Sequence, residues 1–195
     1  MKIFLFYHIY CSLTRFSYYL FLSKSEFVCR IMPRHPENSE IISVPFQKRM
    51  TRLLAEEDTE SGPCTTAEFS KRAGIGKHVI SNAVIYGILP SVPSLIKIAD
   101  YTEKPLLYVL GRSDDETYTP AATRRTFGER LLLLLDERKL KIADVANAPG
   151  VTFARNSVHV WLKRGNLPSL EYLLQLAAYF SVSPDYLLGR TDYRN

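Results

Sequence analysis

The chain has 195 residues, of which 46% are apolar and 23% charged, and its formal net charge at pH 7 is +5. This composition excludes a collagen-like, low-complexity or wholly disordered chain. Three cysteines without a C-x-x-C pair are too few and too scattered for a disulfide framework. A mild basic excess permits a nucleic-acid partner without requiring one. Residues 46–115 hold nine basic and nine acidic side chains, whereas residues 116–195 hold eleven and eight, so the C-terminal part should attract a polyanion more strongly.

The N-terminal segment is strongly apolar. Residues 3–22 contain fifteen apolar side chains, but His8 and Arg15 interrupt the run. An arginine near mid-span costs about 2.5–3.5 kcal/mol, which the apolar residues of this segment barely offset. Met32 opens a polar, proline-bearing segment, and we expect translation to start there, with residues 1–31 an upstream artefact. The alternative is that residues 1–22 are a genuine membrane anchor.

A first group of helices is predicted from residue 46 onward. One apolar helical stripe, with spacing i, i+4, i+7 and i+8, is formed by Phe46, Met50, Leu53 and Leu54. Glycine and proline indicate a loop around residues 59–63. A capping box at Thr65 and Glu68 then opens a short helix that ends at Ala73. Residues 74–76 form a glycine-containing turn, and residues 77–86 form a second helix.

The chain carries an internal repeat. Residues 90–114 match residues 168–192 at a fixed offset of 78 positions without a gap. The identical pairs include Pro90 and Pro168, Leu95 and Leu173, Tyr101 and Tyr179, Tyr108 and Tyr186, Gly111 and Gly189, and Arg112 and Arg190. A fixed period of this kind indicates a duplicated structural unit.

The second copy predicts the same order of elements. Its first apolar stripe is formed by Phe127, Leu131, Leu134 and Leu135. Residues 141–148 form a helix, a turn begins at Gly150, and a further helix ends near Lys163. Ser183 as N-cap, Pro184 at the first helical position and Gly189 past the end define the last helix.

No strand pattern of period two is evident, so we predict an all-α protein. Its expected organisation is an N-terminal segment (1–45), a first domain (46–114), a linker (115–126) and a second domain (127–193), with five helices in each domain.

Two stretches carry a family resemblance: VHVWLKRGNLPSLEYLLQLAAYFSVSPDYLLGRTD (158–192) and ISNAVIYGILPSVPSLIKIADY (80–101). They resemble the Cro/phage-repressor-like (Xre-type) helix-turn-helix regulators of bacteria and phages. The resemblance covers residues 46–114 and 127–193. It implies two tandem lambda-repressor-like helix-turn-helix domains in a cytoplasmic transcriptional regulator, with duplex DNA as the partner and repression as the expected mode.

A helix-turn-helix places its second helix in the major groove, where early residues reach base edges. The expected DNA-binding residues of the first domain are Thr66, Lys77, His78, Ser81 and Asn82, and those of the second are Lys141, Arg155, Asn156, Ser157, His159 and Lys163. Arginine pairs with guanine and asparagine with adenine, so Arg155 and Asn156 have suitable chemistry. Arg164 and the Arg124-Arg125 pair are expected at phosphates, or, for the pair, in a solvated linker. Ile80, Ala83, Val158 and Trp161 should turn to the core.

Three departures distinguish the copies from the family pattern. Ile142, near the start of the first motif helix of the second domain, cannot donate a hydrogen bond to a base. Phe153 and Ala154 are two extra residues that lengthen the turn or shift the helix that follows. The first domain has Ala83 in place of the tryptophan and an apolar helix end at residues 83–85, so we expect the second domain to be the better DNA reader.

The doubling suggests a covalent pseudo-dimer. Twelve linker residues span at most about 40–43 Å, and half-sites on one face of DNA lie about 34 Å apart. One chain can therefore occupy adjacent half-sites, with a homodimer as the other arrangement. The rival function is a protein-interaction module, antitoxin-like or dimerising, that uses the apolar end of the first domain (83–85) as its contact surface.

Other functions find little support in the sequence. The four histidines have no i, i+4 pairing and no cysteine at ligand spacing, so a metal site is not expected. No phosphate-binding loop or nucleophile elbow is present, and we expect neither a catalytic activity nor a cofactor. The acidic residues 114–116 are interpreted as a solvated domain end.

Overall fold

The computed structural model describes residues 41–59 and 62–194. The predictions for the apolar stretch at residues 3–22 and for a start at Met32 fall outside the described residues. The described residues belong to one compact unit. Within the described ranges, no helix is long and apolar enough to cross a bilayer.

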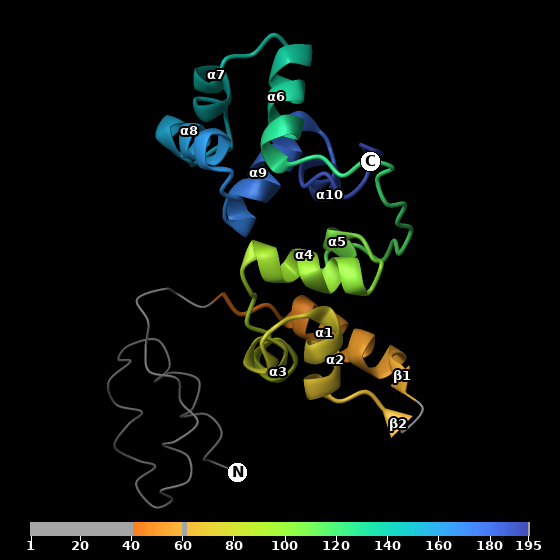
Figure 1. Ribbon diagram of the computed structural model, residues 1–195. Coiled ribbons are helices and arrows are strands. Elements are labelled where there is room, and N and C mark those ends of the chain that lie inside the picture. The colour runs from red at the N-terminus through yellow and green to blue at the C-terminus, as the bar shows by residue number, and fades with distance from the viewer. Residues whose placement is uncertain (1–40, 60–61, 195) are drawn as a thin grey trace, which may run out of the picture. The chain divides into compact units, whose positions relative to one another are not determined.

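The fold is all-α, as predicted, and its described part contains ten helices (Figure 1). The first five are α1 (Val44–Glu56), α2 (Thr66–Ala73), α3 (Lys77–Tyr86), α4 (Val92–Tyr101) and α5 (Leu106–Val109). The second five are α6 (Phe127–Glu137), α7 (Ile142–Ala146), α8 (Arg155–Arg164), α9 (Leu170–Phe180) and α10 (Pro184–Leu187). We call them the first and the second helix set.

Extended backbone is confined to short pieces. Strands β1 (Asp58–Thr59) and β2 (Gly62–Pro63) form an antiparallel pair where a loop was expected. A single bridge joins Ile42 to Ile88. Pieces of one or two residues are too short to produce a period-two pattern, which is why the sequence did not indicate them.

The 78-residue offset extends beyond the matching sequence. Helices α3, α4 and α5 each begin 78 residues before α8, α9 and α10, respectively. Helices α2 and α7 begin only 76 residues apart, so the two extra residues of the second set lie between α7 and α8. Helix α7 is also shorter than predicted, since it ends at Ala146 and not at Ala148.

The predicted apolar stripes form the core. Phe46, Met50 and Leu53 of α1 are buried, as are all four stripe residues of α6. Ile80 and Ala83 have no exposed surface, and Val158 and Trp161 are buried at the equivalent positions of α8. The inward orientation predicted for these four residues is therefore confirmed.

Side-chain caps fix several helix starts. The predicted capping box of α2 is present, because Glu68 N donates to Thr65 Oγ1 and Thr65 N donates to Glu68 Oε2 at 2.9 Å. Thr126 and Glu129 form the same box at α6. Ser183 caps α10 as predicted, accepting from Tyr186 N at 3.1 Å. Each cap satisfies backbone groups that a helix end otherwise leaves open.

Each helix set ties its first helix to the chain after its last helix. Arg49 donates to Asp114 at 2.6 Å and lies 3.7 Å from the ring centroid of Tyr108. The equivalent Arg130 donates to Asp192 at 2.5 Å and lies over the ring of Tyr186. The duplicated contact explains why a buried arginine occurs in both α1 and α6.

The acidic residues 114–116 are not merely a solvated domain end. Asp114 pairs with Arg49, and Glu116 accepts from Lys104 at 2.5 Å and from the Tyr108 hydroxyl at 2.7 Å. All three residues are exposed, as predicted, but the sequence did not indicate their ion pairs, because the partners Arg49 and Lys104 lie in other parts of the first helix set.

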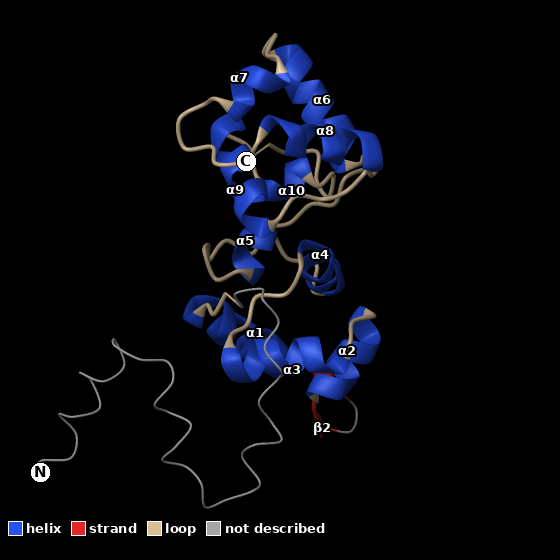
Figure 2. Ribbon diagram, turned by 90° about the vertical axis from the view of Figure 1, so that its left-hand side faces the viewer, coloured by secondary structure: helices blue, strands red, loops and turns tan. Residues whose placement is uncertain are grey.

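The segment 115–126 contacts both helix sets, the first through Glu116 and Arg124 and the second through Tyr118, Ala121 and Ala122. The Tyr118 hydroxyl and Ala121 N both donate to the carbonyl oxygen of Arg190, at 2.9 and 2.8 Å. Ala122 N donates to Asp192. Figure 2 shows α4 and α5 lying between α1–α3 and the second set, where α5 meets α10. The linker is thus a fixed connection within this unit.

Candidate nucleic-acid interface

A short turn joins helices α2 and α3. Gly74 ends α2 in the left-handed conformation, with φ of 65°, and α3 begins only three residues later at Lys77. The left-handed region suits glycine, because a side chain there is strained. The turn allows α2 to pack on α3, and the buried Ile80 and Ala83 hold α3 against the core.

The candidate residues of the first set lie on the outer side of this motif. Lys77 and His78 are exposed, and Ser81 and Asn82 are half-buried one turn later. Thr66 is half-buried at the start of α2, where its carbonyl accepts from Ser70 Oγ. Four of the five candidates therefore share one helix, α3, and Thr66 opens the preceding one.

The candidate residues of the second set follow the same arrangement. Arg155, Asn156 and Lys163 of α8 are exposed, and Ser157 and His159 are half-buried. Lys141 is exposed at the N-cap of α7, where its backbone N–H donates to Asp144 at 2.7 Å. Five of these six residues thus stand on α8, and three of them, Asn156, His159 and Lys163, lie on the side away from Val158 and Trp161.

Phe153 has a role that the sequence analysis missed. It is 3% exposed, and its ring makes edge contacts with Trp161 and Tyr172, with centroids 5.1 and 5.5 Å away. The extra residue therefore anchors the start of α8 in the core. Phe153 and Val158 occupy the two positions of a hydrophobic staple around the N-cap Ala154, and this pattern was the available signal.

The formal charges of α8 are all positive. The helix carries Arg155, Lys163 and Arg164 and no carboxylate. Among the described residues none of these three has an ion-pair partner, whereas Arg49, Arg130 and Arg190 are all paired. Unpaired cations on one helix produce a positive surface that attracts phosphates.

Helix α3 ends differently. Ile85 and Tyr86 are 57% and 44% exposed, at the positions that Lys163 and Arg164 occupy in α8. The apolar surface expected at residues 83–85 is thus corrected: Ala83 belongs to the core, Val84 packs against it, and Ile85 and Tyr86 form the exposed part.

Arg124 forms an ion pair at the surface, where its side chain is 58% exposed. Its guanidinium donates to Asp100 of α4 at 2.7 Å, a contact that neither interpretation of the Arg124-Arg125 pair anticipated. The neighbouring Arg125 is exposed.

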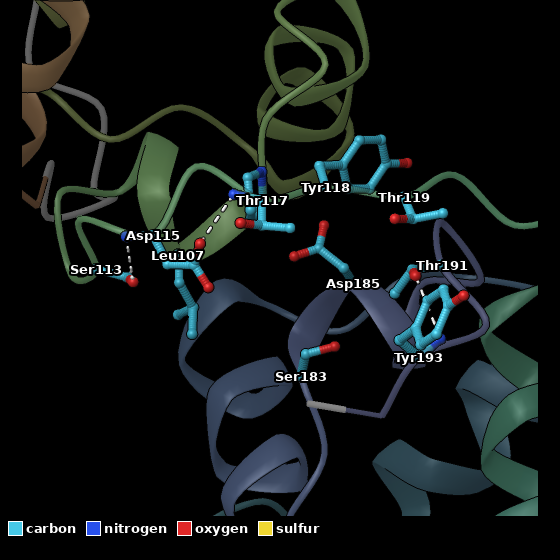
Figure 3. A pocket seen from close by; sticks show the side chains of 11 residues that line it. Leu107, Ser113, Asp115, Thr117, Tyr118, Thr119, Ser183, Asp185, Thr191 and Tyr193 are labelled. Atoms are coloured by element: carbon cyan, nitrogen blue, oxygen red, sulfur yellow. Dashed lines mark hydrogen bonds between the residues drawn. The ribbon is translucent and has the colours of Figure 1, made fainter.

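The described residues also contain a cavity of about 350 Å³ between α5, residues 113–119 and α10. Figure 3 shows hydroxyl side chains around the carboxylate of Asp185, among them Thr117, Thr119 and Thr191. Burial raises the pKa of Asp185, and the nearby Arg190 opposes that rise. Both carboxylate oxygens are already used, by Arg190 and by the backbone N–H of Leu106, so the cavity wall lacks a free acid or base at this position.

No group of three or more histidine, cysteine or acidic side chains in the described segments is arranged to hold a metal ion. The described cysteine, Cys64, is buried and unpaired, and burial raises the pKa of its thiol.

No protein family matches the chain, and neither a curated protein nor a solved structure matches it.

Proposed function

We propose that the protein is a sequence-specific DNA-binding regulator of transcription, with α3 and α8 as its recognition helices. The observation that carries the proposal is the surface of α8, where Arg155 and Asn156 are exposed at the start of the helix and no carboxylate neutralises its cations. Early residues of such a helix reach base edges in the major groove. We further propose that the protein acts in the cytoplasm as a repressor.

The two helix sets contribute unequally in this proposal. Helix α8 combines base-reading side chains with Lys163 and Arg164 for phosphates. Helix α3 offers Lys77 and His78 but ends in exposed apolar side chains. The second set therefore supplies most of the affinity, and the first set adds contacts that the covalent linkage makes intramolecular.

The experiment is a selection of binders from a randomised duplex pool with the full chain, followed by titrations of the winning duplex. Arg155→Ala should cost about 1–3 kcal/mol of binding free energy and relax the base preference at one position. Arg112→Ala is the matched control, because Arg112 is exposed after α5 and lies outside α3 and α8. The control should keep the wild-type preference.

A second candidate function is supported by Ile85 and Tyr86, whose exposed surfaces suit a protein partner. In this case the chain is a dimerising or antitoxin-like module. A pool without an enriched sequence, together with self-association that Ile85→Lys abolishes, would favour this function over DNA reading.

A further inference from the structure

A buried cluster of charged groups joins the two helix sets. Arg190, after α10, has 2% of its surface exposed. Its Nε donates to Asp100 of α4 at 2.7 Å, its Nη2 donates to the carbonyl oxygen of Lys104 at 3.2 Å, and its Nη1 donates to Asp185. The guanidinium also lies 4.6 Å from the ring centroid of Tyr118 in the linker.

Two further contacts complete the cluster. Asp185 of α10 accepts from the backbone N–H of Leu106, the first residue of α5, at 2.8 Å. The second oxygen of Asp100 accepts from Arg124. Arg190 and Asp185 thus have partners in both helix sets, and a buried ion pair needs such additional hydrogen bonds if it is not to be destabilising.

The internal repeat shows that these groups are not needed to form a five-helix set. The first set has Arg112 where the second has Arg190, yet Arg112 is exposed. Ala178 stands in α9 at the position of Asp100, and Leu107 stands in α5 at the position of Asp185. The first set therefore lacks a copy of the Arg190–Asp185 pair, and the contacts of Arg190 with Asp100 and of Asp185 with Leu106 join the sets.

We infer that the Arg190–Asp100 contact fixes the orientation of α8 relative to α3, so that the protein selects duplexes whose two half-sites stand at one separation. This inference rests on the proposed function, and Arg190 is a positioning residue in it, without contact to DNA. A flexible linker allows two DNA-binding helices to bind half-sites at several separations. A junction held by a buried, paired guanidinium allows only one separation of the half-sites, because any other separation breaks these contacts.

The test uses Asp100→Ala in the full chain. Asp100 is one-third exposed, and its side-chain contacts reach only Arg190 and Arg124, both outside the first helix set. The second set already has alanine at the equivalent position of α9, so the helix accepts the change. Asp136→Ala is the matched control, since it removes the same charge from an exposed pair with Lys139 inside one helix set.

The first measurement is the dissociation constant for duplexes in which the separation of the half-sites varies. The wild-type chain and Asp136→Ala should prefer one separation by at least about tenfold over a site shifted by about 5 base pairs, half a helical turn. Asp100→Ala should reduce this preference about fivefold or more and bind the shifted sites comparatively better. Wild-type binding that is insensitive to the separation would overturn the inference even if DNA binding itself is strong.

The second measurement needs no DNA. The backbone N–H of Leu106 exchanges slowly only while Asp185 of the other set accepts from it, whereas the N–H of Leu110 is held by Leu106 O inside α5. Asp100→Ala should accelerate exchange at Leu106 and leave Leu110 unchanged. Fast exchange at Leu106 in the wild-type chain would show that the sets are not held together. If no duplex binds, the proposed function fails, and the exchange data still decide whether the junction exists.

Discussion

The ring of Phe153 lies edge-on to the indole of Trp161, with the two centroids 5.1 Å apart. This contact fixes the start of α8, because Phe153 is separated from that helix by only the N-cap Ala154. Arg155 and Asn156, the side chains proposed to contact bases, are the first two residues of α8. The packing of the buried Phe153 ring therefore sets the position of the helix that carries them.

Phe153→Ala should lower the free energy of unfolding by about 3–5 kcal/mol, since it removes a buried aromatic ring and leaves a cavity. Urea unfolding of the full chain measures the change. Leu132→Ala, on the exposed side of α6 at 53% exposure, is the control and should change stability by no more than about 0.5 kcal/mol. Equal effects of the two substitutions would contradict the assignment of Phe153 to the core.

Alanine substitutions at Gly165 and Gly189 distinguish the cost of backbone strain from the cost of a steric clash. Both have φ near 66°, in the left-handed region. A Cβ at Gly165 meets no atom within 4 Å, whereas a Cβ at Gly189 overlaps the carbonyl oxygen of Arg125. Gly165→Ala should cost about 1–2 kcal/mol from strain alone. Gly189→Ala should cost at least about 2 kcal/mol more, because backbone must move; chemical denaturation curves that coincide for the two variants would refute the close approach.

The capping box at α6 predicts a pH dependence of stability. The backbone N–H of Thr126, and then its hydroxyl, donate to Glu129 and lower the pKa of that carboxyl. A lowered pKa in the folded state gives stability that is present above the ordinary pKa of about 4.3 and is lost as the pH falls through the folded value.

Glu129→Gln removes this titration while keeping an acceptor at the cap. The wild-type thermal midpoint should therefore exceed that of the variant at about pH 6, and the gap should close by about pH 3. Glu103→Gln, at an exposed position without a side-chain hydrogen bond in the described chain, should follow the wild-type curve. A gap that widens in acid would show the sign to be wrong.

Substitutions at the C-terminal ends of α3 and α8 should change the salt dependence of DNA binding in opposite directions. Lys163→Ala should reduce the slope of log K against log salt by about 0.9, the contribution of one phosphate contact. Ile85→Lys, which places a cation at the equivalent position of α3, should raise it by a similar amount if α3 also lies along the backbone. Lys139→Ala, outside both helices, should leave the slope unchanged.

Local sequence signals predicted the helices well where the cause is local. Thr65 and Glu68 cap α2 as their spacing indicates, and the glycine turn before Lys77 places α3 at the predicted bounds. The apolar stripes of α1 and α6 followed from the 3.6-residue period, which depends only on the helix itself, whereas the inward faces of α3 and α8 were expected from the family resemblance.

The contacts that join distant parts were not predictable in this way. Arg112 and Arg190 stand in the same L-G-R motif, yet Arg112 is exposed and Arg190 is buried. The difference comes from their neighbours, since Arg190 meets Asp100 and Lys104 of the other helix set. A motif specifies the residue, whereas the tertiary arrangement specifies its partner.

The contact between Leu106 and Asp185 can form in one direction only. Pro184 stands where the first set has Leu106, and proline has no N–H to donate. The junction is therefore heterologous. A pair of first helix sets would lack the carboxylate of Asp185, and a pair of second helix sets would lack the N–H donor of Leu106. Such a contact closes inside one chain only while the connection between the sets is long enough. A chain with several linker residues deleted would complete it with a neighbouring molecule, giving domain-swapped dimers or open polymers whose size grows with protein concentration.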